Sequence, residues 1–242
     1  MKTFNVMIEY LNQLDASILL FFNGMHSPFF DKFMMLCTGK FIWIPMYATI
    51  LFILFKSFKP KLVLVYAIAL GVAIALTDQT CASIIRPVVE RLRPSNPGNP
   101  LSEYVHLVNG YRGGSYGFPS CHAANSFALA VFIVCLVRRW RLAIFIFGWA
   151  ILNSYSRLYL GVHYPGDLFV GALVGSFFGY ICYRSARLFN TETKGSVSRN
   201  YRTPLFKLNL QPFQQTIGIT VGDIMIFTGT MTLFIIIATS LF

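Results

Sequence analysis

Charged residues are scarce in this sequence, and acidic residues are the scarcest. Only 12% of the 242 residues are charged and 55% are hydrophobic, with 9 Asp and Glu against 20 Lys and Arg. An ordinary soluble domain carries about a quarter of its residues as charges, so this composition excludes one. It indicates instead a protein whose surroundings are largely a lipid bilayer.

Cysteine is also sparse, and no two cysteines are spaced as a pair. Four of the five lie in or near apolar runs: Cys37, Cys81, Cys135 and Cys182. Without a C-x-x-C pattern, the sequence excludes a disulfide framework and argues against a zinc or redox site. The fifth cysteine, Cys121, lies in a polar motif. There is no internal repeat, and Glu9 and Asp15 interrupt the early apolar run, so we expect no cleaved signal peptide.

Six apolar stretches are long enough, or nearly long enough, to cross a membrane. A helical span requires about 20 mostly apolar residues. The stretches are residues 33–55, 62–85, 120–137, 142–160, 164–183 and 223–242. They predict an all-α fold, a polytopic bundle of six transmembrane helices. Residues 4–22 have instead the pattern of an amphipathic helix in the membrane interface, ending at Asn23-Gly24.

Basic residues gather in three connections between these stretches. Twelve of the 20 follow the first, third and fifth stretches: Lys56, Lys59, Lys61, Arg138, Arg139, Arg141, Arg184, Arg187, Lys194, Arg199, Arg202 and Lys207. The positive-inside tendency makes these connections cytoplasmic, which puts both termini and the other loops on the outer side. Because the charges lie in short loops between apolar spans, we expect no nucleic-acid partner.

The segment 86–119 is the only long connection on the outer side. It contains five prolines and five glycines, so it cannot form one regular helix. A long irregular loop above a helix bundle typically shapes a binding site or a lid.

His163 and Asp167 lie four residues apart, beside a predicted span. Pro165 between them suits the first turn of a helix, where its missing N–H is no loss. At that spacing both side chains share one face, so the carboxylate can hold one ring nitrogen and leave the other free as a nucleophile. The alternative is a buried hydrogen bond that only stabilises the bundle, although ionisable residues at membrane depth are often functional.

The segment Pro119-Ser120-Cys121-His122 stands before the third span. Ser120 can cap a helix that starts near Cys121, which leaves free N–H groups directed at an anion. His122 would lie beside that anion and could donate a proton to a leaving group. Taken alone, the segment fits a capped helix with an incidental histidine better.

Three arginines lie at the outer ends of predicted spans: Arg86, Arg93 and Arg157. Snorkelling to the interface would explain each of them separately. Beside two histidines, however, three arginines repel one another unless an anion joins them, and guanidinium groups suit phosphate oxygens. The segments together predict phosphoryl transfer without a metal ion.

The segments 86–94, 119–122 and 156–167 resemble the three motifs of the type 2 phosphatidic acid phosphatase superfamily, the lipid phosphate phosphatases. Those motifs are K-x6-R-P, P-S-G-H and S-R-x5-H-x3-D, and their order and spacing agree here. Two positions depart. Arg86 stands where lysine is usual and keeps the charge, and Cys121 stands where glycine is usual and keeps the backbone N–H while narrowing the pocket.

The resemblance implies a role for each matching residue. His163 is the expected nucleophile that forms a phosphohistidine, Asp167 orients it, and His122 protonates the leaving oxygen and later activates water. The expected phosphate cradle consists of Arg86, Arg93, Ser120, Cys121 through its backbone N–H, and Arg157. No metal and no cofactor are expected, because guanidinium groups and helix ends neutralise the developing charge.

The predicted organisation has four parts. An N-terminal interfacial segment, 1–30, precedes a catalytic membrane core, 31–187, with its outer loop at 86–119. A cytoplasmic loop, 188–222, and a C-terminal transmembrane helix, 223–242, follow.

The prediction for function is a lipid phosphate or diphosphate phosphatase in a bacterial inner membrane, with the active site and both termini periplasmic. Its expected partners are a lipid substrate and the bilayer, and the oligomeric state is left open. Undecaprenyl diphosphate and a lipid A phosphate are favoured over phosphatidylglycerophosphate and phosphatidic acid. Two alternatives stay open: a lipid phosphotransferase using the same phosphohistidine, and an inactive membrane protein resembling a transporter.

Overall fold

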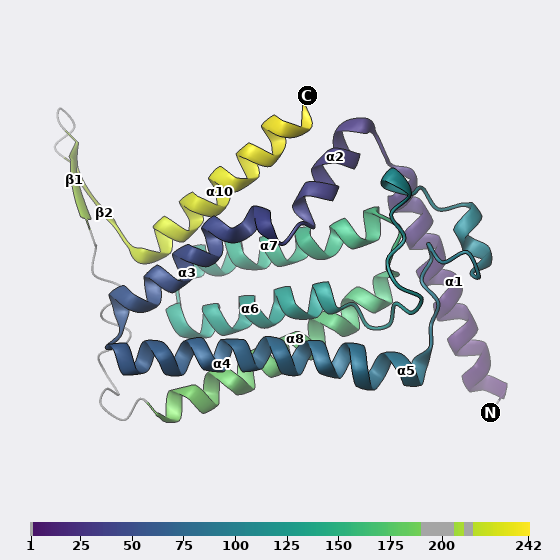
Figure 1. The fold of residues 1–242 in the computed structure, drawn as a ribbon, viewed down its shortest axis with the longest axis horizontal. Coiled ribbons are helices and arrows are strands. Elements are labelled where there is room, and N and C mark those ends of the chain that lie inside the picture. Colours follow the sequence, from purple (N-terminus) through teal and green to yellow (C-terminus); the bar gives the residue numbers. More distant parts are fainter. Residues whose placement is uncertain (1, 190–205, 211–214) are drawn as a thin grey trace.

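The computed structural model describes residues 2–189, 206–210 and 215–242, most of which form a helix bundle (Figure 1). In chain order the elements are α1 (Lys2–Gly24), α2 (Pro28–Cys37), η1 (Phe41–Trp43), α3 (Ile44–Ser57), α4 (Pro60–Gln79), η2 (Thr80–Ile85), α5 (Arg86–Val89), η3 (Pro100–Glu103), η4 (Val108–Gly110), α6 (Cys121–Val137), α7 (Trp140–Tyr159), α8 (Pro165–Leu188), β1 (Phe206–Leu210), β2 (Gln215–Ile219) and α10 (Val221–Ser240). The predicted all-α class is confirmed, with one addition. Strands β1 and β2 form an antiparallel hairpin within the segment predicted as a cytoplasmic loop. The rest of that loop, 190–205 and 211–214, lies outside the described residues.

Each of the six predicted apolar stretches contains helix, but the count of six spans is not confirmed. Among the described residues, three helices are long and apolar enough to cross a membrane: Pro60–Val89, Pro165–Leu188 and Gly222–Ser240. The helix α6 is apolar but shorter. The helix α7 carries Asn153, Ser154, Ser156 and Arg157 in its last two turns, and these polar residues are buried inside the bundle.

The first predicted span, 33–55, is not a single straight helix. The helix α2 meets the helical segment Phe41–Ser57 at an angle of 68°, so the two form either one broken span or a re-entrant loop. Two contacts end α2: Gly39 N–H bonds the Leu36 carbonyl, and Trp43 Nε1 bonds the Cys37 carbonyl at 2.8 Å. The apolar run concealed this break, which a glycine after a helix commonly signals.

The helix that begins at Pro60 continues through the π-helical turn η2 and through α5, so the long loop begins at residue 90 rather than 86. Glu90 ends it in the left-handed region, with φ 50°. Arg86 therefore lies on a helix and Arg93 in the loop. π-Helical turns of this kind often occur at functional sites.

The helices α6 and α8 pack with their backbones in contact. Gly171, Gly175 and Gly179 stand at four-residue intervals along α8, and a side chain at Gly175 would overlap the Ala124 carbonyl of α6. Small residues at such intervals allow close helix contact in membranes. The Ser120 N–H also bonds the Asp167 carbonyl at 3.0 Å, which fixes the two helix starts together.

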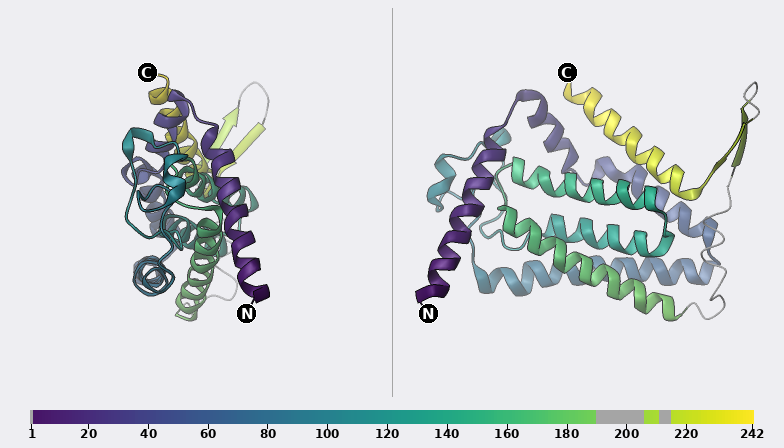
Figure 2. Two further views of the ribbon diagram at one scale, coloured as in Figure 1. Left: turned by 90° about the vertical axis from the view of Figure 1, so that its right-hand side faces the viewer. Right: turned by 180° about the vertical axis from the view of Figure 1, so that it is seen from behind.

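The two ends of the bundle differ (Figures 1 and 2). At one end, which we call the loop end, lie residues 90–120 and the α7–α8 turn, and α1 crosses this end at a steep angle to α6 and α8. The α3–α4 and α6–α7 connections and the hairpin lie at the opposite end. The two basic connections that the structure describes in full, α3–α4 and α6–α7, are therefore separated from the three motifs by the length of the bundle.

Candidate active site

His163 and Asp167 form the predicted pair, with a different local geometry. His163 Nδ1 lies 3.2 Å from Asp167 Oδ2. The helix α8 begins only at Pro165, so His163 precedes the helix and the two side chains do not share a helical face. Asp167 Oδ2 also accepts the N–H of the N-cap residue, Tyr164, at 3.0 Å, so helix capping holds the carboxylate in place.

Arg93 determines which nitrogen of His163 carries the proton. Its Nη1 lies 2.8 Å from His163 Nε2, and a guanidinium group can only donate. Nε2 is therefore the acceptor, and the proton on Nδ1 is donated to Asp167. This leaves the lone pair of Nε2 directed at the arginine, where a phosphate group would be held.

Burial, together with the neighbouring positive charges, favours the neutral form of His163. His163 is 1% exposed. Burial, followed by the charges of Arg93 and Arg157, lowers the pKa of His163 well below its usual value. Burial and repulsion from Arg86 and Arg157 lower the pKa of Arg93 to about 10, so Arg93 remains a cation at neutral pH. A neutral imidazole thus faces a buried cation, as a nucleophile for an anionic phosphate requires.

Arg86 connects the end of the α4–α5 helix to the start of α6. Its Nη2 donates to the Pro119 carbonyl at 3.0 Å and lies 3.2 Å from Cys121 Sγ. Its Nε is buried and has no hydrogen-bond partner among the described residues. The cysteine that replaces the usual glycine is therefore in contact with the arginine that replaces the usual lysine.

Arg157 is 3% exposed and reaches toward the same region from α7. Its Nη1 donates to Thr38 Oγ1 at 2.9 Å, and its Nη2 donates to Tyr111 Oη at 3.1 Å. Its Nε, like that of Arg86, is buried without a partner in the described part of the chain. Buried donors without acceptors are rare in folded proteins, and a phosphate group supplies such acceptors.

Ser120, Cys121 and His122 begin α6 as predicted. Ser120 is the N-cap, and its Oγ accepts the Ala123 N–H at 3.5 Å. His122, the second residue of α6, lines a cavity and lies within electrostatic range of Arg157 and His163. The structure thus brings all eight predicted site residues to the loop end of the bundle.

Arg91 and Asp15 also belong to this site, and the sequence analysis assigned them no role. Arg91 Nη1 lies 3.0 Å from Asp167 Oδ1 and 2.7 Å from Asp15 Oδ2. Asp15 Oδ1 accepts the Gly166 N–H at 2.7 Å. A carboxylate on α1 thus holds the arginine that holds Asp167. The available signal was an acidic residue interrupting an apolar run, with an arginine inside the first motif.

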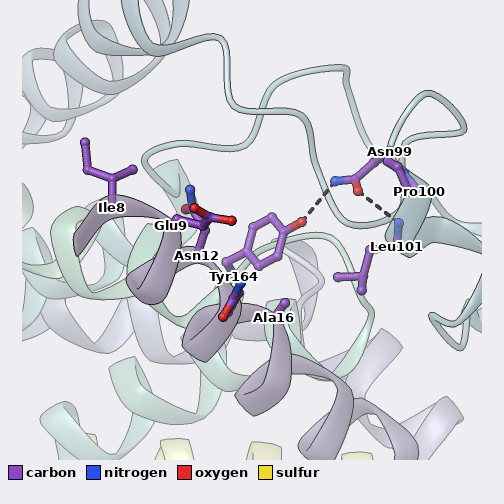
Figure 3. A pocket seen from close by; sticks show the side chains of 9 residues that line it. Ile8, Glu9, Asn12, Ala16, Asn99, Pro100, Leu101 and Tyr164 are labelled. Carbon is purple, nitrogen blue, oxygen red and sulfur yellow. Dashed lines mark hydrogen bonds between the residues drawn. The ribbon is translucent and has the colours of Figure 1, made fainter. Parts of the chain in front are cut away.

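Tyr164 completes the contact between α1 and the loop end (Figure 3). Its ring lies between α1, at Asn12 and Ala16, and the loop, where Asn99 Nδ2 donates to Tyr164 Oη at 2.9 Å. The Arg91 guanidinium lies 3.9 Å from the centre of the same ring. A cavity of about 570 Å³ remains between α1 and the loop beside Tyr164.

Gly117 is a third residue whose role was not predicted from the sequence. A Cβ there would lie 3.0 Å from Asp167 Oδ2 and 3.2 Å from Arg93 Cγ. Its N–H bonds the Arg91 carbonyl at 2.9 Å. The absence of a side chain lets the loop pass directly over the histidine and aspartate pair.

Metal ligands are not clustered within the described ranges: no group of three or more His, Cys, Asp or Glu side chains could hold a metal ion there. The independence from metal stays a prediction, to be tested by chelation.

Comparisons with known proteins find related sequences and a related structure. Residues 60–190 match the family model of the PAP2 superfamily. The chain is 51% identical over 227 residues to the lipid A 4'-phosphatase of Bacteroides thetaiotaomicron, covering 94% of this chain and 95% of that one. It is 36% identical over 179 residues to the lipid A 4'-phosphatase of Porphyromonas gingivalis, covering 73% and 75%. The crystal structure of Aquifex aeolicus LpxE is similar, with a TM-score of 0.51 and 25% identity, covering 71% of this chain and 95% of that one.

Proposed function

The chain belongs to the PAP2 superfamily, and from this premise we propose that it removes the 4'-phosphate of a lipid A-type glycolipid. It is a membrane-bound lipid phosphatase, which agrees with the prediction from its motifs. Of the two substrates favoured from the sequence, the relative that matches nearly the whole chain supports the lipid A phosphate over undecaprenyl diphosphate.

The observation that carries the proposal is the hydrogen bond from Arg93 to His163 Nε2, at 2.8 Å. It leaves the nucleophilic lone pair aimed at a cation. An arriving phosphate group offers Arg93 better acceptors than an imidazole nitrogen does, because charge-assisted hydrogen bonds to phosphate are the stronger ones. Arg93 then turns to the phosphate oxygens, and Nε2 is left facing phosphorus.

The reaction then follows from the positions of the two histidines. Nε2 of His163 attacks phosphorus as the bond to the lipid oxygen breaks, and that oxygen takes the proton of His122. Asp167 accepts a hydrogen bond from Nδ1–H of His163 and so stabilises the positive charge that develops on the ring. Water then attacks the phosphohistidine, gives its proton to His122, and inorganic phosphate leaves.

The phosphate oxygens acquire their partners from four elements. Arg86 and Arg157 each present a buried Nε without an acceptor among the described residues. Arg93 comes from the loop, and the first N–H groups of α6, at Cys121 and His122, add the positive end of a helix. Preorganised donors of this kind supply most of the stabilisation in many enzymes.

The membrane placement belongs to the same proposal. The loop end, with the active site and α1, faces the periplasm, because the basic connections lie at the other end. α1 lies in the interface. A lipid keeps its acyl chains in the bilayer while its phosphate reaches the loop end.

The test is phosphate release by purified protein in detergent, from lipid A phosphorylated at both the 1 and 4' positions. We expect inorganic phosphate and a product that has lost the 4'-phosphate, identified by mass-spectrometric fragmentation, with EDTA present throughout. Release that requires an added divalent ion would contradict the mechanism. A labelled acceptor lipid in the same reaction tests for phosphotransfer, and the absence of release from every lipid phosphate supplied would contradict the proposal.

A further inference from the structure

A cavity of about 510 Å³ leads from His122 into the bundle, between α3, α4, α6 and α7. Since His122 is proposed to protonate the leaving oxygen, the leaving group must lie on this side of the phosphate. The inference below rests on the proposed function and concerns what this cavity binds.

The part of the cavity near His122 is polar, although it lies among apolar spans. Asn125 Nδ2 lies 3.3 Å from Asp78 Oδ1, and Asn153 Nδ2 donates to Ser126 Oγ at 2.6 Å. Asp78, Asn125 and Asn153, which we call the polar shelf, all line the cavity. An ionisable residue such as Asp78 within an apolar span is costly and commonly marks a binding site.

Two acceptors of the polar shelf have no partner among the described residues: Oδ1 of Asn125 and Oδ1 of Asn153. Asn153 is only 8% exposed. Deeper in the cavity, Trp149 is 4% exposed, and its Nε1 donor is also without a partner in the described part of the chain. Three residues that line one cavity therefore each have a hydrogen-bonding atom without a partner among the described residues, and leaving such atoms unpaired is unfavourable.

The rest of the cavity wall is apolar and includes Tyr47, Ile50, Leu70, Ile74 and Leu129. A suitable occupant thus needs hydroxyl or amide groups near the phosphate and hydrocarbon beyond them. The polar shelf lies one helical turn below the phosphate site. Asn125 is four residues from Cys121 on α6 and Asn153 is four residues from Arg157 on α7, which is about 6 Å along each helix. That distance matches a sugar ring attached to the bound phosphate.

We propose that this cavity binds an acylated aminosugar as the leaving group, and that Asn125, Asn153 and Trp149 select it. Ring hydroxyls and amide N–H groups donate to the two asparagine oxygens, and Trp149 Nε1 donates to a carbonyl or hydroxyl oxygen. The acyl chains follow the apolar wall toward the bilayer. A polyprenyl diphosphate leaves as a prenyl phosphate. Its ionised oxygens cannot donate to the two asparagine oxygens, and the chain beyond them offers no acceptor to Trp149, so a site built for these hydrogen bonds discriminates against it.

The experiment compares kcat/KM for two substrates in the same detergent, the acylated glucosamine disaccharide phosphate and undecaprenyl diphosphate. Asn153→Leu keeps the side-chain size and removes the acceptor together with the hydrogen bond to Ser126, a structural loss that both substrates share. We expect it to lower the ratio of kcat/KM for the glycolipid to that for the polyprenyl diphosphate by about tenfold, the effect of one lost hydrogen bond in a buried site. Trp149→Phe is the second variant and should lower the same ratio without changing the shelf.

Ile74→Leu is the matched control, because it alters the apolar wall of the same cavity but no hydrogen bond. It should change kcat/KM for both substrates by similar factors. Equal losses on both substrates in Asn153→Leu and Trp149→Phe, or no change in the ratio, would overturn the inference while leaving the phosphatase function intact. Wild-type protein that hydrolyses neither substrate would instead contradict the proposed function.

Discussion

The imidazole of His163 combines two properties at the scale of a single residue: it is neutral, and its Nε2 lone pair is directed at the Arg93 guanidinium. The proposal predicts that His163→Ala lowers turnover by at least about 1,000-fold, because no other group can form the phosphohistidine. His122→Ala should also lose most activity, yet a substrate with a good leaving group should leave some phosphoenzyme trapped. Phosphate release and acid-labile labelling of the protein check both. Substantial turnover by His163→Ala, with normal melting behaviour, would contradict the assignment.

The low pKa of His163 leads to a pH prediction. Burial and Arg93 favour the neutral ring in the folded protein, so the nucleophile is lost only below the usual histidine range near pH 6.5. The decline of kcat/KM assigned to His163 in acid should therefore lie below pH 6.5. Stability should fall in the same direction, because an unfolded chain takes up a proton below about pH 6.5 that the folded chain does not. An NMR titration of His163 that gives an ordinary pKa would contradict both expectations.

Variants of Arg86 test the motif position at which this chain has arginine and the family usually has lysine. Its Nη2 is already bonded to the Pro119 carbonyl and lies beside Cys121, while its buried Nε has no hydrogen-bond partner in the part of the chain that the structure describes. Arg86→Lys should keep much of the activity, because the charge is retained. Arg86→Ala should lower kcat/KM by roughly 10 to 150-fold, which corresponds to a charge-assisted contact of about 1.5 to 3 kcal/mol. No kinetic change in Arg86→Ala would leave Arg86 as a snorkelling residue only.

The sequence predicted which residues lie together better than it predicted their geometry. The motif spacing led to eight candidate site residues, and each of them lies at the loop end. Spacing alone could not show that α8 begins after His163, since the pair is set by a helix cap rather than by one helical face. It also could not show Arg91, Asp15 or Gly117, whose roles depend on contacts between segments distant in the sequence.

At the scale of elements, the contact between α6 and α8 keeps the two histidines together. The glycines of α8 stand against the α6 backbone, so a larger side chain must push the helices apart. Gly175→Leu should destabilise the protein by several kcal/mol or prevent folding, through overpacking. Gly148→Leu on α7, where nothing lies within 4 Å of the added Cβ, is the matched control and should melt near the wild-type temperature in detergent. Equal melting temperatures for the two variants would contradict this account of the packing.

α1 is an element outside the family match, which begins at residue 60, and yet it supplies Asp15 to the site. Asp15→Asn should lower kcat by a few-fold to about tenfold, because Arg91 then holds Asp167 less firmly and the His163 ring is less well oriented. Asn12→Ala is the control, since its contact to Arg91 is longer, at 3.3 Å, and exposed. A structural effect alone would lower the melting temperature without changing the pH profile of kcat. Identical profiles and rates in both variants would contradict a positioning role for α1.

The elements were easier to predict than their breaks. Apolar length located helix in all six stretches, because the bilayer imposes helical secondary structure on long apolar runs. The 68° bend near Gly39 and the polar last turns of α7 lie together at the site, where Arg157 Nη1 donates to Thr38 Oγ1. A prediction from hydrophobicity alone treats the bend as part of one continuous span and the polar turns as the end of a weakly apolar span.

At the scale of the whole molecule, charge separates the two ends of the bundle. The α3–α4 and α6–α7 connections, which carry Lys56, Lys59, Arg138 and Arg139, lie at the end opposite the motifs, so the positive-inside tendency predicts that the loop end faces the periplasm. The prediction is asymmetric labelling in intact cells by a membrane-impermeant thiol reagent. In a background lacking the five native cysteines, Glu103→Cys at the loop end should be labelled and Lys61→Cys at the start of α4 should not. Both side chains are exposed, so permeabilised cells should label both and provide the control. The reverse pattern would put the active site in the cytoplasm, where it would act on lipids of the inner leaflet.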